Sequence, residues 1–578
     1  MSNNRLRRQS FLAACFSLPL LSLSIPALAQ DTDAPTREEL DPDGPDDGLL
    51  PPANVRFDGE FARQNCPFVG NELRVRIDRI EFVNPAGGAV PEELLESLSA
   101  ITAPGGEQEL ASVCDIRDAA NNALRRDGWI ARVQVPQQTL TDTLQLNVIA
   151  ARISEIRVVG NAGPFRDQIA SQVEALQGVY PLNERDAERI LLLANDVPGI
   201  TLQLSLAPGQ AGTGDVVGNL AIDFEPYAVL LNTRNYNSRR IGRETLYGRF
   251  EYYGLTGLAD RTFVAAQTTY DFDEQVLVQA GHDFALGASG LRAGAAFTYA
   301  WSNPFIENLD LSTDTLLADV NVTMPVLRRV AASADLTLGL EYADQETKVG
   351  AISLSKDATR TVYLRGDFAT AISNMGSFRT YSQGFLELRH GLGILGATEF
   401  GPFGTAQTDG VSASRPFGDS TAFVVRGEAT AGVVSSVGLG LNLTLAGQYT
   451  DDPLLNFDEF SIGNLTVGRG YDPGANSGDR AIGVAAEVTQ DFVLREGLKL
   501  QAFGFYDIVQ VENLDQGTPD PLRTLESWGG GLRLNLTKGL SAEIAYAEPL
   551  DRPLFNDTTE PPARVLFSIS TRFPSLLR

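Results

Sequence analysis

Histidine, cysteine and positive charge are all scarce in this 578-residue chain. It contains two histidines, three cysteines, and 46 Lys and Arg against 73 Asp and Glu, which gives a formal net charge of −27. Phosphate backbones are bound by clustered lysine and arginine, so this charge argues against nucleic-acid binding. His282 and His390 have no serine partner by spacing, and no G-x-S-x-G sequence is present. We therefore expect no catalytic residues and no enzyme activity.

Signals for a cofactor or a metal are equally weak. Gly391, Gly393 and Gly396 fit G-x-G-x-x-G, but a dinucleotide site needs a helix directly after the last glycine, and the sequence predicts none there. Metal binding would need more ligands than the few cysteines provide. We expect no cofactor and no metal.

Long apolar runs are confined to the first thirty residues. Three arginines precede an apolar run that ends at Ala29 with the small-residue pattern Ala-Leu-Ala. This pattern is typical of a secretory signal peptide, so we predict that residues 1–29 are removed on export. A lipoprotein anchor at Cys15 is the alternative, but the apolar region follows this cysteine instead of preceding it. Beyond residue 30, no apolar stretch approaches the ~20 residues of a membrane helix.

An exported chain without this segment retains Cys66 and Cys114. In an oxidising compartment two cysteines are expected to form one disulfide, with free thiols as the alternative. Residues 30 to about 58, which precede the first of them, are acidic and rich in proline, glycine and aspartate. We interpret residues 30–70 as a disordered linker and assign no structure to them.

Two similar α/β segments follow, with an internal repeat of about 75 residues. Residues 71–151 contain a strand-like stretch, two stretches with helical spacing and two further strands, and residues 152–225 repeat this order. The sequence therefore predicts two consecutive β-α-α-β-β units. Residues 129–135 and 201–206 are the candidate exposed edges of their sheets.

From residue 226 to residue 578 the helical pattern is replaced by alternation with a period of two. Leu439, Leu441, Leu443 and Leu445, for example, alternate with Gly440, Asn442 and Thr444. One uniformly apolar face and one polar face indicate a sheet whose outside contacts lipid and whose inside is wet. A soluble β-sandwich also alternates, but its strands are shorter and so large a sandwich would split into domains. We predict an antiparallel transmembrane barrel of roughly 14 to 18 strands, most simply 16.

One polar stretch late in this region does not fit a strand. It reads Val467, Gly468, Arg469, Gly470 and Tyr471, an arginine between two glycines and beside an aromatic residue. Glycine allows positive φ and close backbone approach, so the arginine can be directed to an unusual place. In the predicted strand that follows later, Asp507 lies on the wet face, and a half-buried carboxylate needs a partner. An incidental arginine in an exposed loop is the alternative.

Two such units before a barrel, with FSIGNLTVGRGYDPGANSGDRAIGVAAEV inside it, resemble the outer-membrane transporters of two-partner secretion. These are the haemolysin and filamentous haemagglutinin exporters, whose paired units are called POTRA domains. In that family the sixth extracellular loop folds back into the lumen and carries V-R-G-Y or V-R-G-F at its tip. This chain has one glycine more. The resemblance implies that Arg469 pairs with Asp507. Some members also plug the pore with an N-terminal helix, which the sequence of residues 30–58 does not predict here.

The resemblance also implies the function. It implies α+β POTRA domains in the periplasm, followed by an all-β barrel in the Gram-negative outer membrane. The barrel would export one unfolded secreted partner protein, large and β-helical, that the POTRA domains recognise. Other expected partners are membrane lipid and, during biogenesis, the barrel assembly machinery, and we expect a monomer. The alternatives are an assembly factor of the same superfamily and a passive porin or channel.

Overall fold

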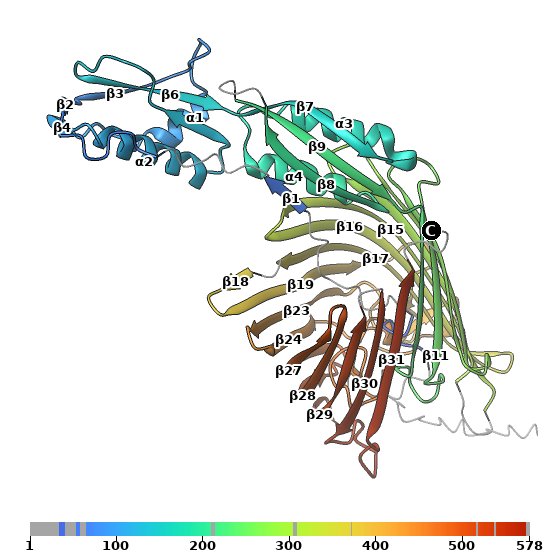
Figure 1. Ribbon diagram of the computed structural model, residues 1–578. Coiled ribbons are helices and arrows are strands. Elements are labelled where there is room, and N and C mark those ends of the chain that lie inside the picture. The colour runs from blue at the N-terminus through green and yellow to red at the C-terminus, as the bar shows by residue number, and fades with distance from the viewer. Residues whose placement is uncertain are drawn as a thin grey trace, which may run out of the picture.

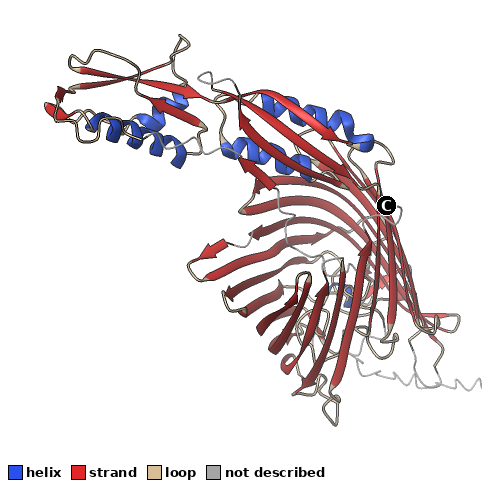
Figure 2. Ribbon diagram, in the orientation of Figure 1, coloured by secondary structure: helices blue, strands red, loops and turns tan. Residues whose placement is uncertain are grey.

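The computed structural model describes residues 34–40, 54–57, 65–209, 214–304, 309–370, 373–515, 518, 520–536 and 539–573. The predicted signal peptide lies outside these ranges. Two α/β units lead into a large barrel (Figures 1 and 2). Among the described residues, no helix is long and apolar enough to cross a membrane.

The first unit is a small sheet with two helices packed on it. β3 (Arg79–Val83) pairs in parallel with β6 (Thr143–Ala150), and β5 (Ala131–Gln134) pairs antiparallel with β6. The helices are α1 (Glu92–Leu98) and α2 (Ser112–Arg126), and a second sheet joins β2 (Arg74–Arg76) to β4 (Glu107–Glu109). The core combines apolar residues of both helices and the sheet, namely Ile77, Leu94, Leu98, Val113, Ala120, Leu124, Leu144 and Leu146. Their three- and four-residue spacing in α2 produces the amphipathic helix that the sequence predicts.

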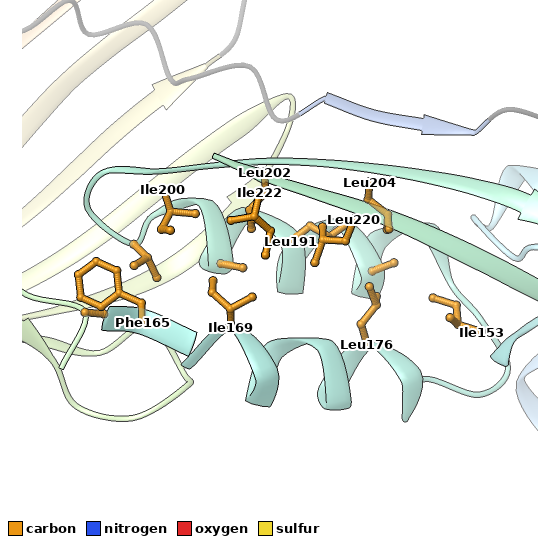
Figure 3. Close-up of a cluster of buried hydrophobic side chains, with 14 of the residues drawn as sticks. Ile153, Phe165, Ile169, Leu176, Leu191, Ile200, Leu202, Leu204, Leu220 and Ile222 are labelled. Carbon is orange, nitrogen blue, oxygen red and sulfur yellow. The ribbon is translucent and has the colours of Figure 1, made fainter. Parts of the chain in front are cut away.

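The second unit repeats this arrangement. β7 (Arg152–Gly160) pairs in parallel with β9 (Asp215–Phe224), and β8 (Ile200–Pro208) pairs antiparallel with β9. Between β7 and β8 lie η1 (Gly163–Phe165), α3 (Arg166–Gln177) and α4 (Glu184–Asn195). The side chain of Asn183 accepts a hydrogen bond from the backbone of Arg185 and so caps the start of α4. Figure 3 shows the core, in which Ile169 and Leu176 of α3 face the sheet residues Leu204 and Leu220.

The second unit is joined to the barrel by packing and by an ion pair. Tyr253 and Ala259 of the barrel belong to the same buried cluster as the core of this unit. Arg328 of the barrel donates from Nε to Asp196 Oδ2, next to the end of α4, at 2.7 Å. The unit therefore has a fixed position at one end of the barrel.

Sixteen antiparallel strands close into the barrel. In order around the wall they are β10 (Tyr227–Arg234), β11 (Thr245–Tyr253), β12 (Arg261–Thr269), β13 (Gln275–Ala285), β14 (Arg292–Ser302), β15 (Leu311–Arg329), β16 (Ala332–Val349), β17 (Ile352–Thr370) with its continuation β18 (Ser373–Met375), β19 (Phe378–Gly391), β23 (Phe423–Ser435), β24 (Leu439–Thr450), β27 (Arg480–Arg495), β28 (Leu498–Glu512), β29 (Leu522–Leu536), β30 (Leu540–Pro549) and β31 (Arg564–Phe573). β10 pairs with β31 and closes the wall. The predicted fold class, including the strand number, is confirmed.

The two faces of the wall differ as the alternation predicts. The leucines of β24 that we assigned to one face, such as Leu441 and Leu443, are about half exposed on the outside. The residues between them face inward, where Asn442 accepts a hydrogen bond from Tyr381 at 2.8 Å. An apolar outside suits lipid, and a hydrogen-bonded inside suits water and polar ligands.

Two short parts of the predicted linker have defined structure. β1 (Asn54–Phe57) pairs in parallel with β8 of the second unit, from Asn54 opposite Gln203 to Phe57 opposite Leu206. Residues 34–40 lie inside the barrel, as described below. The expectation that residues 30–70 have no structure is therefore wrong for these two parts. Four residues shortly after two prolines carry too little periodicity to predict a strand whose partner lies about 150 residues away.

Candidate functional site in the barrel lumen

The loop between β24 and β27, residues 451–479, folds back into the barrel. Counted from β10, it is the sixth loop on the side away from the two α/β units. It contains η2 (Asn456–Asp458) and a hairpin of β25 (Phe460–Ser461) with β26 (Ser477–Gly478). Its apolar residues are buried against inward-facing residues of the wall, in a cluster of Ile462, Val467, Tyr471, Ala446, Val509, Val511 and Leu525. The hydrophobic effect thus holds the loop inside the lumen.

Arg469, near the tip of this loop, is bound to two carboxylates of the wall. Its Nη2 donates to Asp507 Oδ1 at 2.7 Å, and its Nε donates to Asp507 Oδ2 at 3.0 Å. Its Nη1 donates to Glu487 Oε2 at 2.7 Å, and the guanidinium lies 3.7 Å from the ring centroid of Phe505. Asp507 is completely buried. A buried carboxylate is stable only when charged and polar groups satisfy it, which the two-pronged contact does.

The glycines on either side of Arg469 have separate geometric roles. Gly468 has φ of 110°, a conformation that residues with a side chain rarely adopt. A Cβ atom at Gly470 would lie 2.7 Å from the backbone nitrogen of Pro549 and 2.8 Å from Ser527 Cβ. Gly468 therefore turns the chain, and Gly470 lets it pass close to the wall.

The two residues after Gly470 fix the loop further. The Tyr471 hydroxyl donates to the carbonyl of Glu526 at 2.8 Å and accepts from the backbone of Asp551 at 3.1 Å. Asp472 forms ion pairs with two arginines of the wall region. Its Oδ2 lies 2.9 Å from Arg243 Nη2, and its Oδ1 lies 2.7 Å from Arg564 Nη1. Arg243 lies two residues before β11 and Arg564 begins β31, so Asp472 links the loop to the region where the barrel closes.

Residues 34–40 form a turn in the lumen, between the wall and loop 451–479. Arg37 donates from Nη1 to Glu341 Oε2 of the wall at 2.7 Å and from Nη2 to Asp458 Oδ1 of the loop at 2.8 Å. Its guanidinium lies 4.4 Å from the ring centroid of Phe457. Leu40 is buried in a cluster with Phe457 and Leu277. This segment therefore joins the loop to the opposite wall.

A local motif shapes this turn. The backbone of Thr36 donates to Glu39 Oε2 at 3.1 Å, and the backbone of Glu39 donates to Thr36 Oγ1 at 3.3 Å. These reciprocal bonds are those of a capping box, and the spacing T-x-x-E was a signal for it in the sequence. Glu39 Oε1 also accepts from the backbone of Ser238 at 2.8 Å. Burial raises the pKa of Glu39 to about 7, although these hydrogen bonds act in the opposite direction.

The two candidate sheet edges, residues 129–135 and 201–206, are both occupied. β8 is covered by β1. At β5, the side chain of Asn121 in α2 accepts from the backbone of Val133 at 2.8 Å and donates to its carbonyl at 3.0 Å. This amide takes the place of a neighbouring strand. β7 pairs with β9 alone among the described strands, and its Val158 and Val159 are 50% and 65% exposed. In the second unit the open edge of the sheet is thus β7, on the side opposite to β8.

Cys66 and Cys114 are joined by a disulfide, with Cα atoms 5.7 Å apart. The bond ties the segment before β2 to the first turn of α2 and closes 48 residues of the first unit. Among the residues that the structure describes, no group of three or more His, Cys, Asp or Glu side chains is placed to hold a metal ion.

Sequence reasoning missed several of the residues that hold the lumen together. Glu487 and Asp472 take part in the arginine contacts, and Arg37 and Asp458 join the N-terminal segment to the loop. The alternation of β27 places Glu487 on the inward face of the wall. The sequence could therefore predict that this side chain faces the lumen, but not that it binds Arg469. The other three lie in irregular segments, where no periodicity indicates a direction.

Solved structures with a similar fold include two proteins from different bacteria. CdiB from Escherichia coli has a TM-score of 0.69 at 17% identity, covering 87% of this chain and 92% of that one. CdiB from Acinetobacter baumannii has a TM-score of 0.63 at 17% identity, covering 86% and 90%. At this identity the similarity shows a shared fold. A search of curated proteins gave no match.

A sequence model of the family described as "Haemolysin secretion/activation protein ShlB/FhaC/HecB" matches residues 223–534. This range covers more than half of the chain and includes loop 451–479, Glu487 and Asp507. The chain belongs to this family, the outer-membrane transporters of two-partner secretion.

Proposed function

We propose that this transporter binds one unfolded secreted protein through its two POTRA units in the periplasm and exports it through the barrel. The observation that carries the proposal is the lumen itself. Its wall is charged, and the loop and the turn inside it are held by side-chain contacts that can be exchanged, such as Arg37 with Glu341 and Asp458. A polar path that opens by exchange of ion pairs suits an extended polypeptide.

The POTRA units supply the binding surface for the client. An extended segment can add to an open sheet edge, where backbone hydrogen bonds give affinity with little dependence on sequence. β7 is such an edge, and its exposed Val158 and Val159 favour an apolar client segment. A large β-helical client would present many such segments. Its folding outside the cell would then give the movement its direction without nucleotide energy.

One copy of the chain is sufficient for this function. β10 pairs with β31 over six residues and completes the wall within a single chain. We therefore infer a monomer that the barrel assembly machinery inserts into the outer membrane.

Deletion of the gene tests the proposal. We expect one large polypeptide to disappear from the culture medium while other outer-membrane barrels remain at normal levels, as measured by quantitative proteomics of both fractions. Re-expression of the whole chain should restore secretion. A general decrease of many barrels would show an assembly factor instead. Unchanged secretion of every polypeptide, with altered uptake of small solutes, would show a passive channel.

A further inference from the structure

A further buried arginine lies at the outer end of the barrel, apart from the contacts of Arg469 and Arg37. Arg415 belongs to the loop between β19 and β23, the fifth on this side, which also contains the small sheet of β20 (Glu399–Phe400), β21 (Ala406–Thr408) and β22 (Val411–Ser412). Its guanidinium contacts Asp479, Glu459 and Asp515, and we call these four residues the Arg415 cluster. All four side chains are at most 15% exposed.

The Arg415 cluster connects three consecutive outer loops. Arg415 lies in the fifth loop and Asp515 in the seventh. In loop 451–479, Glu459 directly precedes β25 and Asp479 directly follows β26, so the two residues flank the hairpin. Arg415 Nη1 is 2.5 Å from Asp479 Oδ1 and 2.6 Å from Glu459 Oε1. Its Nη2 is 2.8 Å from Asp515 Oδ2. One guanidinium therefore holds both sides of the hairpin that carries Arg469 and also the loop beyond it.

Backbone groups of the same loops complete the cluster. Asp479 accepts from the backbone of Leu454 and from that of Leu514, each at 2.7 Å. Arg415 Nη1 also donates to the carbonyl of Leu454 at 2.8 Å. Because these bonds cross between loops, the loops cannot separate while the cluster is intact.

The charges of the cluster are not balanced. Three carboxylates face one guanidinium. Among the described residues, the other side chains bound to them are neutral, Ser477 on Glu459 and Asn513 on Arg415. Burial raises the pKa of Glu459 to about 7, Asp479 and Asp515 act in the same direction, and Arg415 opposes them. The pKa of Glu459 in the folded protein is therefore above its ordinary value of 4.5. The cluster is therefore most stable at low pH and loses stability as the pH rises through about 7.

We propose that the Arg415 cluster is a latch that holds the fifth, sixth and seventh outer loops closed over the barrel, and that ionisation of Glu459 loosens it. The inference requires only that the chain is an outer-membrane pore, whichever client it exports. Arg415 is a positioning residue here, because it acts through the loop that carries Arg469. A measurement without a client therefore separates this inference from the proposed export function.

Labelling of a single buried position tests the latch. Leu454 is 1% exposed beside Arg415, whereas Phe403 in the fifth loop is 94% exposed. Leu454→Cys and, separately, Phe403→Cys are expressed in the full chain, and intact cells are treated with a membrane-impermeant maleimide between pH 6 and 8. The ratio of the two labelling rates removes the pH dependence of the thiol reaction. We expect this ratio to be low at pH 6 and to rise several-fold by pH 8.

Two variants and two controls make the test specific. Glu459→Gln places a side chain at this position that cannot ionise, so the labelling ratio should stay low at every pH. Arg415→Ala should raise it by about tenfold or more at every pH, because buried carboxylates lose their partner. Arg523→Ala is the control for loss of an arginine near the seventh loop, because Arg523 pairs with Asp520 outside the cluster. This variant should show the same labelling ratio as the parent chain. Glu39→Gln should keep the full pH profile, since Glu39 lies outside the cluster.

Two results would overturn the inference. One is a flat pH profile in the parent chain. The other is a profile that Glu459→Gln leaves unchanged. If Arg415→Ala does not insert, as judged by heat-modifiable migration, the comparison of the parent with Glu459→Gln still decides the question.

Discussion

Arg469 holds the tip of the lumenal loop through a buried carboxylate, so its contribution can be isolated by mutation. Removing either partner leaves the other charge without compensation inside the lumen, at a cost of up to ~3 to 5 kcal/mol. We expect Arg469→Ala and Asp507→Ala each to reduce secretion strongly while the barrel still inserts. A double-mutant cycle on secretion and on heat-modifiable stability measures the coupling.

The matched control is Arg480→Ala. This arginine lies at the end of the same loop, but its partners Asp451 and Glu512 are exposed, and exposed pairs contribute ~0 to 1 kcal/mol. Arg480→Ala should therefore leave secretion nearly unchanged. Arg469→Lys should restore little function, because an ammonium group cannot make the two-pronged contact with Asp507. Additive effects of the Arg469 and Asp507 substitutions would contradict the functional pairing that we propose.

At the residue scale, the sequence contained part of this site. The period of two places Asp507 on the inward face, and the resemblance to the exporters pairs it with Arg469. Neither argument includes Glu487, the second carboxylate on the same guanidinium. Asp472 was missed for the same reason. Its two arginines, Arg243 and Arg564, are separated from it by 229 and 92 residues, and no local pattern relates positions so far apart.

Strand edges of the POTRA units lead to a prediction at the element scale. β7 is paired on one side only, and natural proteins block such edges with lysine. Val158→Lys together with Val159→Lys should therefore reduce client binding several-fold, as measured with purified transporter and a client fragment. Val69→Lys with Leu73→Lys is the matched control, because these residues are likewise exposed, 79% and 64%, but lie in the first unit. Equal binding by both double variants would place the docking edge elsewhere.

The disulfide between Cys66 and Cys114 gives a second prediction at this scale. Closing 48 residues is expected to stabilise the first unit by roughly 2 to 4 kcal/mol. Reductant, or Cys66→Ser with Cys114→Ser, should make this unit cleavable by protease at lower denaturant concentrations. The barrel contains no cysteine and serves as the internal control. A cleavage pattern that is insensitive to reductant would contradict this role.

Elements with strong periodicity were predictable, and those fixed by tertiary contact were not. α2 and α4 have apolar residues at helical spacing over three turns or more, and most strands of the barrel are ten or more residues long. β1 has four residues and exists through its pairing with β8. Asn121 reads as an ordinary helix residue, yet it occupies the edge of β5 because α2 packs beside that strand.

At the scale of the whole molecule, the N-terminal turn, loop 451–479 and the wall form one connected structure in the lumen. Arg37 contacts Glu341 and Asp458 on one side of this structure. Glu459, the next residue, contacts Arg415 at the outer end. Two adjacent residues of one loop thus link the inside of the pore to its outer mouth. We therefore expect that releasing the N-terminal turn opens the pore.

Arg37→Glu tests this expectation. It places a third carboxylate between Glu341 and Asp458, and repulsion should expel the turn from the lumen. The wall should remain intact because Glu341 keeps its contact with Arg389 at 2.5 Å. We expect at least about a tenfold rise in the open fraction of single channels in planar bilayers. Arg76→Glu, an exposed arginine in β2, is the matched control. An open fraction equal to that of the parent chain would mean that loop 451–479 closes the pore without the N-terminal turn.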